Sequence, residues 1–454
     1  IGYIGAGSLQ FGPMIVQDIL MSNILEENEL KIYLMDIEKS HLDHVIEHGQ
    51  YVKKKLARNA EIVATIDMNE AIKDADFVIC ALEKDRNVYW SQDFHIPRKY
   101  GFEQVYGENG GVGSLFHALR NIKVIMDLAI KMEELCPNAI LLNFSNPEHK
   151  ICEAVTRLTS IKAVGLCHGV FMGREQLSKL LDVPLNDLQT KACGMNHFTW
   201  FQEIKQKSTG EDLYPKLKKI EQKGDWLANW HELALGRILF RRFGQWPSPA
   251  SNHYGEYLQW AGEFVIPQLQ FFYDPYDGHP WENNQIPEGV YTVDQVNYER
   301  EWTKDWSKKL LPVGSTEEIQ LQNEDGNFQS SGEIATLIME SIATNKKEWL
   351  EAVNVPNNGA IPNLPDSFVV EVPAYSDSSG IHPIQMQPIP EVIAATIRLH
   401  ASIHQLLVEA YNEKSKDKLL QAILIEPTVN SYRNAVQMCN EMLILQKDVL
   451  PELK

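Results

Sequence analysis

The sequence opens with Ile1-Gly2-Tyr3-Ile4-Gly5-Ala6-Gly7-Ser8, a short apolar run that ends in two glycines one residue apart. Residues 1–4 predict a buried strand, and the helical spacing of apolar side chains over residues 11–20 predicts a helix directly after the glycine turn. A strand that passes through a glycine turn into a helix is typical of the first unit of a dinucleotide-binding α/β domain. The third glycine of that fingerprint is absent, because Gln10 stands in its place.

Strand and helix patterns alternate from this opening unit onward. Further strands are predicted at 31–35, 60–65, 76–81, 139–143 and 161–166, and helices at 41–56, 69–73, 114–135 and 147–158. Such alternation is typical of a doubly wound parallel sheet with helices on both faces. We therefore predict an α/β fold in which residues 1–190 form a Rossmann-like, doubly wound N-terminal domain.

The pattern changes beyond residue 190. A strand is predicted at 194–204, helices at 225–243, 331–343 and 390–414, an extended segment at 368–372, and an irregular proline- and aromatic-rich stretch at 245–306. We predict that residues 191–454 form a mixed α+β C-terminal domain that contributes to substrate binding, the metal site and oligomerisation.

The composition indicates a globular protein with an acidic surface. Hydrophobic residues make up 44% and charged residues 23% of the 454, which excludes collagen-like and wholly disordered classes. The formal net charge is −19, so we expect neither a nucleic acid nor a membrane partner. With no long apolar run, no signal-peptide pattern and six cysteines without a C-x-x-C pair, a cytoplasmic protein with reduced thiols is expected.

A dinucleotide site is predicted at the opening turn. The backbone amides of Gly5, Gly7 and Ser8, together with the following helix N-terminus, are suited to a pyrophosphate. Asp36 ends the second predicted strand, where a carboxylate accepts ribose hydroxyls and repels a 2′-phosphate, so NAD is favoured over NADP. The alternative is a tight turn with a helix-capping aspartate.

Two further segments are candidates for ligand contacts. Glu108 begins a loop, residues 107–114, with four glycines in seven positions, and Asn146 follows the strand at 139–143. Open α/β sheets bind ligands at the carboxyl ends of their strands. A flexible loop and an ordinary Asn-Pro turn are the alternatives.

Cys167 and His197 are candidate metal ligands. Cys167-His168-Gly169 follows the strand at 161–166, and Asn196-His197 lies within the strand predicted at 194–204. A thiolate and an imidazole bind divalent transition metals, and two protein ligands leave positions open for substrate oxygens. The alternative is a buried cysteine and a structural histidine.

Taken in order, these groups resemble glycoside hydrolase family four, the NAD- and manganese-dependent glycosidases. The matching pieces span most of the chain and lie at residues 5–8, 34–36, 108–113, 143–147, 167–169, 194–197, 357–359, 370–372 and 380–381. The family's chemistry differs from that of glycosidases with two carboxylates. Bound NAD takes hydride from sugar C3, a base removes the C2 proton while a metal on O2 and O3 stabilises the enolate, and the leaving group departs from C1. Water then adds and the hydride returns.

The resemblance assigns roles by position. Cys167 and His197 match the ligands of Mn²⁺ or another divalent metal, Asn146 matches a substrate-positioning asparagine, and Glu108 matches an acidic position near the sugar. His168 is the candidate for assisting departure of the leaving group.

The C2 base is the least defined of these roles. His253 falls on the position of the family's base, and Tyr254 and Glu256 are its rivals. An imidazole of ordinary pKa can act as a base near neutral pH.

The expected substrate is an unphosphorylated α-glycoside. The Cys-His-Gly sequence at 167–169 resembles the branch that acts on unphosphorylated sugars, and residues 251–257 look most like the α-galactosidases, with α-glucosides as the next choice. The alternative is a uronide or sulfosugar glycoside, for which Arg98, Lys99, Arg241 and Arg242 are either anion ligands or solvated charges.

Two other classes share parts of this pattern. An NAD-dependent dehydrogenase of a hydroxy acid or sugar would produce net NADH and would not need Cys167 and His197 together. A non-catalytic NAD-binding regulator would keep Gly5, Gly7 and Asp36 only. The resemblance also implies a homodimer or homotetramer, with a small-molecule glycoside as the partner.

Overall fold

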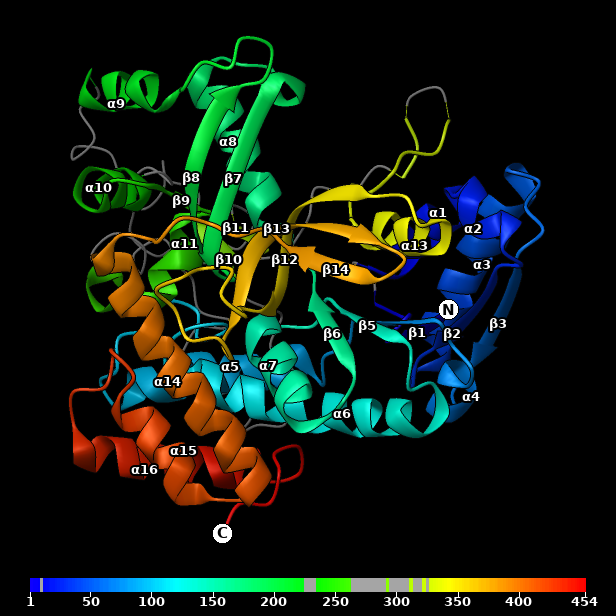
Figure 1. Cartoon of the computed structure of the whole chain (residues 1–454). Helices are drawn as coiled ribbons and strands as arrows, with labels where there is room; N and C mark the ends of the chain where they lie inside the picture. Colours follow the sequence, from blue (N-terminus) through cyan, green and yellow to red (C-terminus); the bar gives the residue numbers. More distant parts are fainter. Residues whose placement is uncertain (9–10, 224–233, 263–290, 294–309, 313–320, 324–325) are drawn as a thin grey trace.

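One long sheet runs through the part of the chain that the computed structural model describes, namely residues 1–8, 11–223, 234–262, 291–293, 310–312, 321–323 and 326–454 (Figure 1). The sheet has the strand order β3-β2-β1-β4-β5-β6-β12-β13-β7-β8-β9, with β14 paired to β13. A separate antiparallel pair is formed by β10 (Tyr291–Val293) and β11 (Leu310–Pro312).

The first six strands are parallel and alternate with helices. The strands are β1 (Gly2–Ile4), β2 (Lys31–Met35), β3 (Glu61–Thr65), β4 (Phe77–Cys80), β5 (Ile140–Asn143) and β6 (Lys162–Gly165). The helices are α1 (Gly12–Met21), α2 (Asn23–Glu27), α3 (Lys39–Lys55), α4 (Met68–Ile72), α5 (Arg86–Lys99), α6 (Gly113–Leu135), α7 (Glu148–Leu158) and α8 (Gly169–Leu181). The predicted Rossmann-like α/β class is confirmed, and each predicted strand of this half ends within one residue of the observed one.

The sheet continues beyond β6 as an antiparallel half. Its strands are β12 (Glu348–Pro356), β13 (Val369–Asp377), β7 (Leu188–Met195), β8 (Phe198–Gln206), β9 (Trp246–Ser248) and β14 (Gly380–Pro383). Asn354 of β12 pairs with Gly165 of β6, and Glu371 of β13 pairs with Gly194 of β7. These two pairings bring the end of β6 and the end of β7 to the same edge of the sheet.

The prediction of one strand over residues 194–204 is wrong. The segment is a hairpin of β7 and β8, and Asn196 and His197 form the turn between them. His197 has a φ of 63°, a left-handed conformation that strands do not contain. Apolar residues flank the turn on both sides, so the sequence around Asn196 and His197 resembles a continuous strand.

The remaining helices cover the sheet and the far end of the molecule. They are α9 (Tyr214–Lys223), α10 (Ala234–Phe243), α11 (Ser251–Tyr254), α13 (Ala335–Thr344), α14 (Glu391–Glu413), α15 (Lys416–Leu424) and α16 (Tyr432–Leu445), with the 3-10 turns η1 (Leu185–Asp187), η2 (Gly255–Tyr257) and η3 (Gln259–Ala261). Of the helix predicted at 225–243, residues 225–233 lie outside the described residues and the remainder is α10. Most of the irregular stretch at 245–306 also lies outside them.

Apolar cores fill both faces of the sheet. Tyr3 of β1 belongs to the core that contains α1 and α13, whereas its neighbour Ile4 belongs to the core that contains α6 and α14 to α16. The C-terminal helices therefore complete the core of the N-terminal strands, as Figure 1 shows for α14 to α16 beside α6. The division of the chain at residue 190 stays a prediction.

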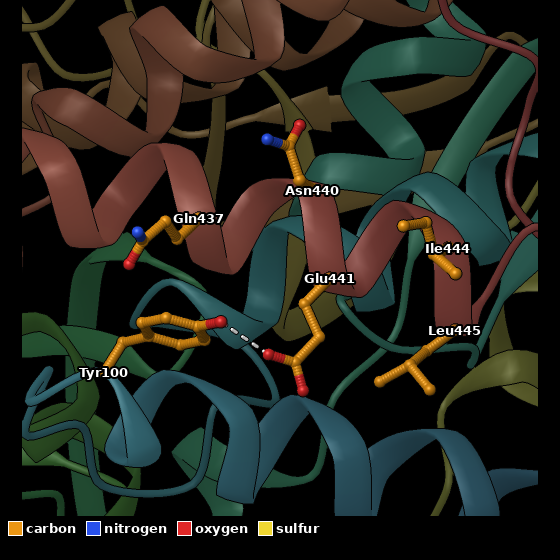
Figure 2. Close-up of a pocket in the computed structure, with 6 residues that line it drawn as sticks. All are labelled: Tyr100, Gln437, Asn440, Glu441, Ile444 and Leu445. Atoms are coloured by element: carbon orange, nitrogen blue, oxygen red, sulfur yellow. Dashed lines mark hydrogen bonds between the residues drawn. The ribbon is translucent and has the colours of Figure 1, made fainter.

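Helix α16 also contacts the end of α5 through polar side chains. The Tyr100 hydroxyl donates a hydrogen bond of 2.6 Å to Glu441 of α16 (Figure 2). A shallow pocket beside this contact is lined by Tyr100, Gln437, Asn440, Glu441, Ile444 and Leu445. Among the described residues, no helix is long and apolar enough to cross a membrane.

Candidate active site

The glycine turn after β1 is held against the end of β2. The Gly5 amide donates to the Met35 carbonyl at 2.9 Å, and Gly5 has a φ of 79° that favours glycine. The Gly7 amide donates to Asp36 Oδ2 at 3.0 Å, and a Cβ at Gly7 would lie 2.7 Å from that oxygen. Ser8 Oγ accepts a 3.2 Å bond from the Phe11 amide. Gln10 lies outside the described residues.

This turn has the features that a dinucleotide requires. The first turn of α1 contains no acidic side chain, so the positive end of the helix dipole is not neutralised by its own residues. A glycine at position 7 lets a ligand approach the backbone beside the Asp36 carboxylate. The residues present therefore fit NAD.

The glycine-rich loop at residues 107–113 is built around the carboxylate of Glu256. Its Oε2 accepts three backbone bonds, from Glu108 at 3.0 Å, Asn109 at 3.0 Å and Gly110 at 2.8 Å. A Cβ at Gly110 would lie 2.6 Å from the Glu256 carbonyl, so this position requires glycine. Burial, followed by the charge of Glu108, raises the pKa of Glu256 to about 8, against the effect of the loop amides. Glu256 therefore has a structural role in positioning the loop.

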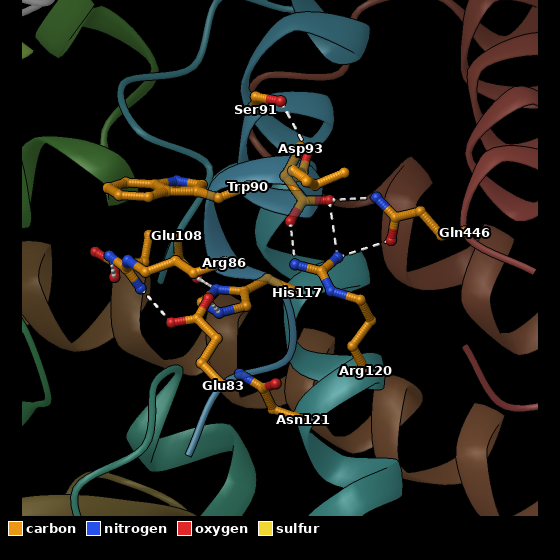
Figure 3. A network of polar contacts seen from close by, with 12 residues as sticks. Glu83, Arg86, Trp90, Ser91, Asp93, Glu108, His117, Arg120, Asn121 and Gln446 are labelled. Atoms are coloured by element: carbon orange, nitrogen blue, oxygen red, sulfur yellow. Dashed lines mark hydrogen bonds and ion pairs between the residues drawn. The ribbon is translucent and has the colours of Figure 1, made fainter. Parts of the chain in front are cut away.

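The side chain of Glu108 is fixed by a buried network (Figure 3). Its Oε1 accepts a 2.6 Å bond from Arg86, which also pairs with Glu83. His117 Nε2 lies 2.9 Å from Glu83, and His117 Nδ1 bonds the Glu108 carbonyl at 2.9 Å. Burial alone would raise the pKa of Glu83, but the charges of Arg86 and His117 outweigh it and lower that pKa to about 2. Hydrogen bonds therefore fix both the backbone and the carboxylate of Glu108.

The two candidate metal ligands lie where β6 ends and where β7 turns into β8. Cys167 is partly exposed, and its Sγ accepts a 3.4 Å bond from the Gly169 amide. His197 is buried, and its Nδ1 has no hydrogen-bond partner among the described residues. The Asn196 amide is close enough to the Cys167 thiol to lower its pKa in part. A thiol and an orphaned imidazole nitrogen fit a transition metal.

Two buried carboxylates lie near Cys167. Glu148 of α7 and Glu371 of β13 both accept bonds from the Asn354 amide, at 2.9 Å and 3.3 Å. Burial, and then the charges of Glu371 and Glu148, raise the pKa of Cys167 well above its usual range. Excess negative charge around a thiol is what a bound divalent cation would offset. Among the described residues, no group of three or more His, Cys, Asp or Glu is arranged to hold a metal.

His253 lies directly against His197. The two rings are 4.5 Å apart between centroids, edge to face. His253 Nδ1 donates to Asn252 Oδ1 at 2.7 Å, because an amide oxygen only accepts, and the Asn252 amide in turn donates to the Tyr106 hydroxyl at 2.5 Å. This tautomer leaves Nε2 with the free lone pair, and burial lowers the pKa of the ring, which favours the neutral imidazole.

The rivals of His253 have other partners. The Tyr254 hydroxyl bonds Ser251 Oγ at 3.1 Å and packs against Gly236 of α10. Tyr257, which the sequence did not single out, is buried and donates from its hydroxyl to the Asn196 carbonyl at 3.2 Å. Tyr257 therefore contacts the candidate metal turn through its hydroxyl.

His168 and Asn146 lie at the rim of the site. His168 starts α8, its side chain is 41% exposed, and its Nδ1 lies 3.5 Å from Glu333. The hydrogen bond to Glu333 raises the pKa of His168. Asn146 is partly exposed and precedes a cis peptide bond to Pro147, and its carbonyl accepts a 2.5 Å bond from Asn121.

Three of the four cations considered as anion ligands are engaged elsewhere. Arg98 donates to the Gln104 and Val105 carbonyls at 2.8 and 2.9 Å. Lys99 pairs with Glu441 at 2.7 Å, and Arg241 pairs with Glu221. Arg242 is exposed.

The sequence interpretation missed a set of buried polar residues on α7. Glu148, His149 and Lys150 are all buried, and Lys150 donates to Ser114 at 2.9 Å and to the Asn109 carbonyl at 2.5 Å. Burial lowers the pKa of Lys150 to about 7, while Glu256 acts in the opposite direction. The available signal was three consecutive polar residues at the start of the helix predicted at 147–158.

Comparison with known proteins places the chain in a family. It belongs to family 4 of the glycosyl hydrolases, because the Family 4 glycosyl hydrolase model matches residues 1–183 and the Family 4 glycosyl hydrolase C-terminal domain model matches residues 192–429. The chain is therefore a glycoside hydrolase, which confirms the resemblance drawn from the motifs.

Characterised relatives extend over the whole chain. An alpha-glucosidase from Erwinia rhapontici is 30% identical over 99% of this chain and 98% of its own length. An alpha-galactosidase from Bacillus subtilis is 29% identical over 100% of this chain and 99% of its own length. An alpha-galacturonidase from Thermoanaerobacter italicus is 27% identical over 97% of this chain and 95% of its own length. The crystal structure of a 6-phospho-alpha-glucosidase from gut microorganisms in complex with NAD and Mn²⁺ superposes with a TM-score of 0.74 at 24% identity, over 100% of this chain and 99% of that one. This likeness shows the fold.

Proposed function

We propose that this chain hydrolyses an unphosphorylated α-glycoside, an α-galactoside or α-glucoside, by transient oxidation at C3 with NAD, deprotonation at C2, elimination and addition of water. Family membership supports the class of reaction, and the names of the relatives from Erwinia rhapontici and Bacillus subtilis support the sugars. The observation that carries the proposal is the contact of His253 with His197, which sets a neutral base beside a candidate metal ligand.

The cofactor sites follow from the geometry above. Gly5, Gly7, Ser8 and Asp36 would hold NAD, and Cys167 with His197 would hold Mn²⁺ or another divalent metal. When bound, NAD supplies a reversible hydride acceptor for C3 and the metal supplies a Lewis acid for the sugar oxygens.

The two catalytic histidines have opposite electrostatic environments. Burial lowers the pKa of His253, so it is ready to accept the C2 proton on Nε2. Glu333 raises the pKa of His168, which favours the protonated ring that can donate to the departing oxygen. When the surroundings shift the pKa values of two titratable groups in opposite directions, the group with the lower pKa is assigned as the base and the other as the acid.

Glu108 and Asn146 are the proposed sugar contacts. The Arg86 bond fixes the Glu108 carboxylate and the His117 bond holds its backbone carbonyl, so the carboxylate loses little entropy when it accepts a sugar hydroxyl. Asn146 follows β5 at the same edge of the sheet, where its amide can both donate and accept. These two residues would orient the sugar between the NAD turn and the two histidines.

Neutral sugars are favoured because three of the four side chains considered as anion ligands are bonded to other groups of the protein. Arg98, Lys99 and Arg241 each hold a carbonyl or carboxylate of the fold. A panel of nitrophenyl glycosides tests the choice: α-galactosides or α-glucosides should give the highest kcat/KM, and uronides or sulfosugar glycosides should be cleaved poorly. Preference for an acidic sugar would overturn the neutral assignment. NADH accumulation on free sugars without cleavage would identify a dehydrogenase instead.

We also expect a cytoplasmic homodimer or homotetramer that binds neither nucleic acid nor membrane, with a small-molecule glycoside as partner. The net charge of −19 supports the expectation that the protein binds neither nucleic acid nor membrane. Light scattering coupled to size-exclusion chromatography measures the assembly, and a monomer at micromolar concentration would contradict it.

A further inference from the structure

A line of buried titratable side chains lies between α7 and α14, outside the site described above. His149 and Glu153 are four residues apart on α7, and His400 and His404 are four residues apart on α14. All four are buried, with exposures from 0 to 3%. Residues four apart occupy one face of a helix, so the two helices present these polar faces to each other.

The line runs outward from His149 to solvent. The rings of His149 and His404 are 4.6 Å apart between centroids, and His404 Nδ1 lies 3.5 Å from Glu153 Oε2. The other oxygen of Glu153 lies 3.3 Å from Arg157 Nε. Arg157 is 24% exposed and bonds Ser367 at 2.8 Å in an exposed contact, so the line ends at the surface.

The inner end of the line lies at the candidate active site. The His149 ring is 6.4 Å from the Tyr257 ring, and the Tyr257 hydroxyl donates to the Asn196 carbonyl at 3.2 Å. Asn196 precedes His197, which contacts His253. A series of buried polar groups thus extends from the turn at Asn196 and His197, beside the proposed base, to the protein surface.

Packing alone gives no reason for this arrangement. Apolar side chains of similar volume between two helices are as stable or more stable than buried ionisable groups. Nor do these residues form a metal site, since no metal-holding group of three or more His, Cys, Asp or Glu occurs among the described residues. Buried polar groups at such separations are commonly joined by internal water.

We propose that Tyr257, His149, His404 and Glu153, with intervening water, form a proton route between the sugar C2 base and solvent. This inference rests on the proposed function. At each transfer a histidine accepts a proton on one nitrogen and releases one from the other, and the Glu153 carboxyl accepts on one oxygen and releases from the other. The proton taken from C2 leaves by this route, and a solvent proton returns by it when water adds, so no net charge is moved.

The electrostatic surroundings suit such exchange. Burial raises the pKa of Glu153 to about 8, with Arg157 acting in the opposite direction. Burial, and then the charges of His149, Lys150, His400 and Arg157, lowers the pKa of His404. Near neutral pH the carboxyl therefore holds its proton and His404 is uncharged, so a proton can enter the line from either end.

A C2-deuterated nitrophenyl α-glycoside tests the route with the holoenzyme in ordinary water. The measured quantity is the fraction of released sugar that retains deuterium at C2, determined by mass spectrometry early in the reaction. Wild-type enzyme should exchange most of the label with solvent. Glu153→Gln and His404→Gln interrupt the line at separate positions, so each should raise the retained fraction several-fold and lower kcat by about tenfold.

Glu426→Gln is the matched control, because Glu426 is an equally buried glutamate whose hydrogen bonds go to Thr428. It should leave the retained fraction at the wild-type value even if turnover falls. The route would be overturned if Glu153→Gln or His404→Gln folds and retains the same fraction of deuterium as the wild type. It would also be overturned if the wild type retains all of the deuterium. Cleavage that does not require NAD would instead contradict the proposed function.

Discussion

The imidazole rings of His197 and His253 meet edge to face, with centroids 4.5 Å apart and an interplanar angle of 81°. One ring lies in the left-handed turn between β7 and β8, and the other lies in the short helix α11, so a contact between distant segments creates the centre of the site. The bond from His253 Nδ1 to Asn252 directs the free nitrogen of His253 away from Asn252.

Replacement of the proposed base tests this arrangement first. His253→Gln removes the titratable nitrogen but keeps a polar side chain, so kcat should fall by about 10² to 10⁴. Binding of NAD and of Mn²⁺, measured by calorimetry, should remain. Tyr254→Phe is the control, because that hydroxyl bonds Ser251, and it should change kcat by less than about threefold. Equal losses in the two variants would contradict the assignment.

The metal pair is tested by binding as well as by turnover. Cys167→Ser and His197→Ala should each abolish measurable Mn²⁺ binding in electron paramagnetic resonance titrations and lower kcat at least about 100-fold. Added Mn²⁺ should not restore activity. Cys136→Ser, at a buried cysteine outside the candidate site, should bind Mn²⁺ as the wild type does. Normal turnover in both ligand variants would exclude the proposed site.

Asp36 should determine the choice of dinucleotide. Asp36→Asn keeps one of the two oxygens that accept the Gly7 and Glu38 amides and removes the negative charge. NAD affinity should fall about tenfold, equal to about 1.4 kcal/mol, and the discrimination against NADP should decrease. Fluorescence titration with both dinucleotides measures this. If their affinities are unchanged, Asp36 only caps the turn.

The pH dependence should report the contact of His168 with Glu333. A leaving-group acid must be protonated, so activity is lost as pH rises through the pKa of His168. Glu333 raises that pKa, and Glu333→Gln should therefore move the alkaline limb of the kcat/KM profile to lower pH. The acid limb, set by His253, should stay in place. An alkaline limb that does not move would assign the acid to another group.

The strands could be predicted because each one combines a buried apolar run with a turn signal at its end. Residues 31–35 illustrate this, since they coincide with β2. The hairpin at Asn196 and His197 could not be predicted, because a left-handed turn inside an apolar run has no local sequence signature.

The motif residues of the candidate site were visible in the sequence, but their surroundings were not. Glu148 and Asn354 are 206 residues apart and bond at 2.9 Å. Glu256 appeared as a rival base, yet its oxygen accepts three loop amides. Such contacts depend on which strands pair across the sheet, which no local pattern encodes.

The central claim is that glycoside cleavage depends on a redox cofactor that is not consumed. Release of nitrophenol from an α-galactoside or α-glucoside should be measured with NAD, Mn²⁺ and a thiol each present or withheld, while absorbance at the NADH wavelength is followed. We expect that cleavage requires NAD and Mn²⁺, is sustained by the thiol, and produces no net NADH. Undiminished cleavage by enzyme freed of NAD and metal would contradict it.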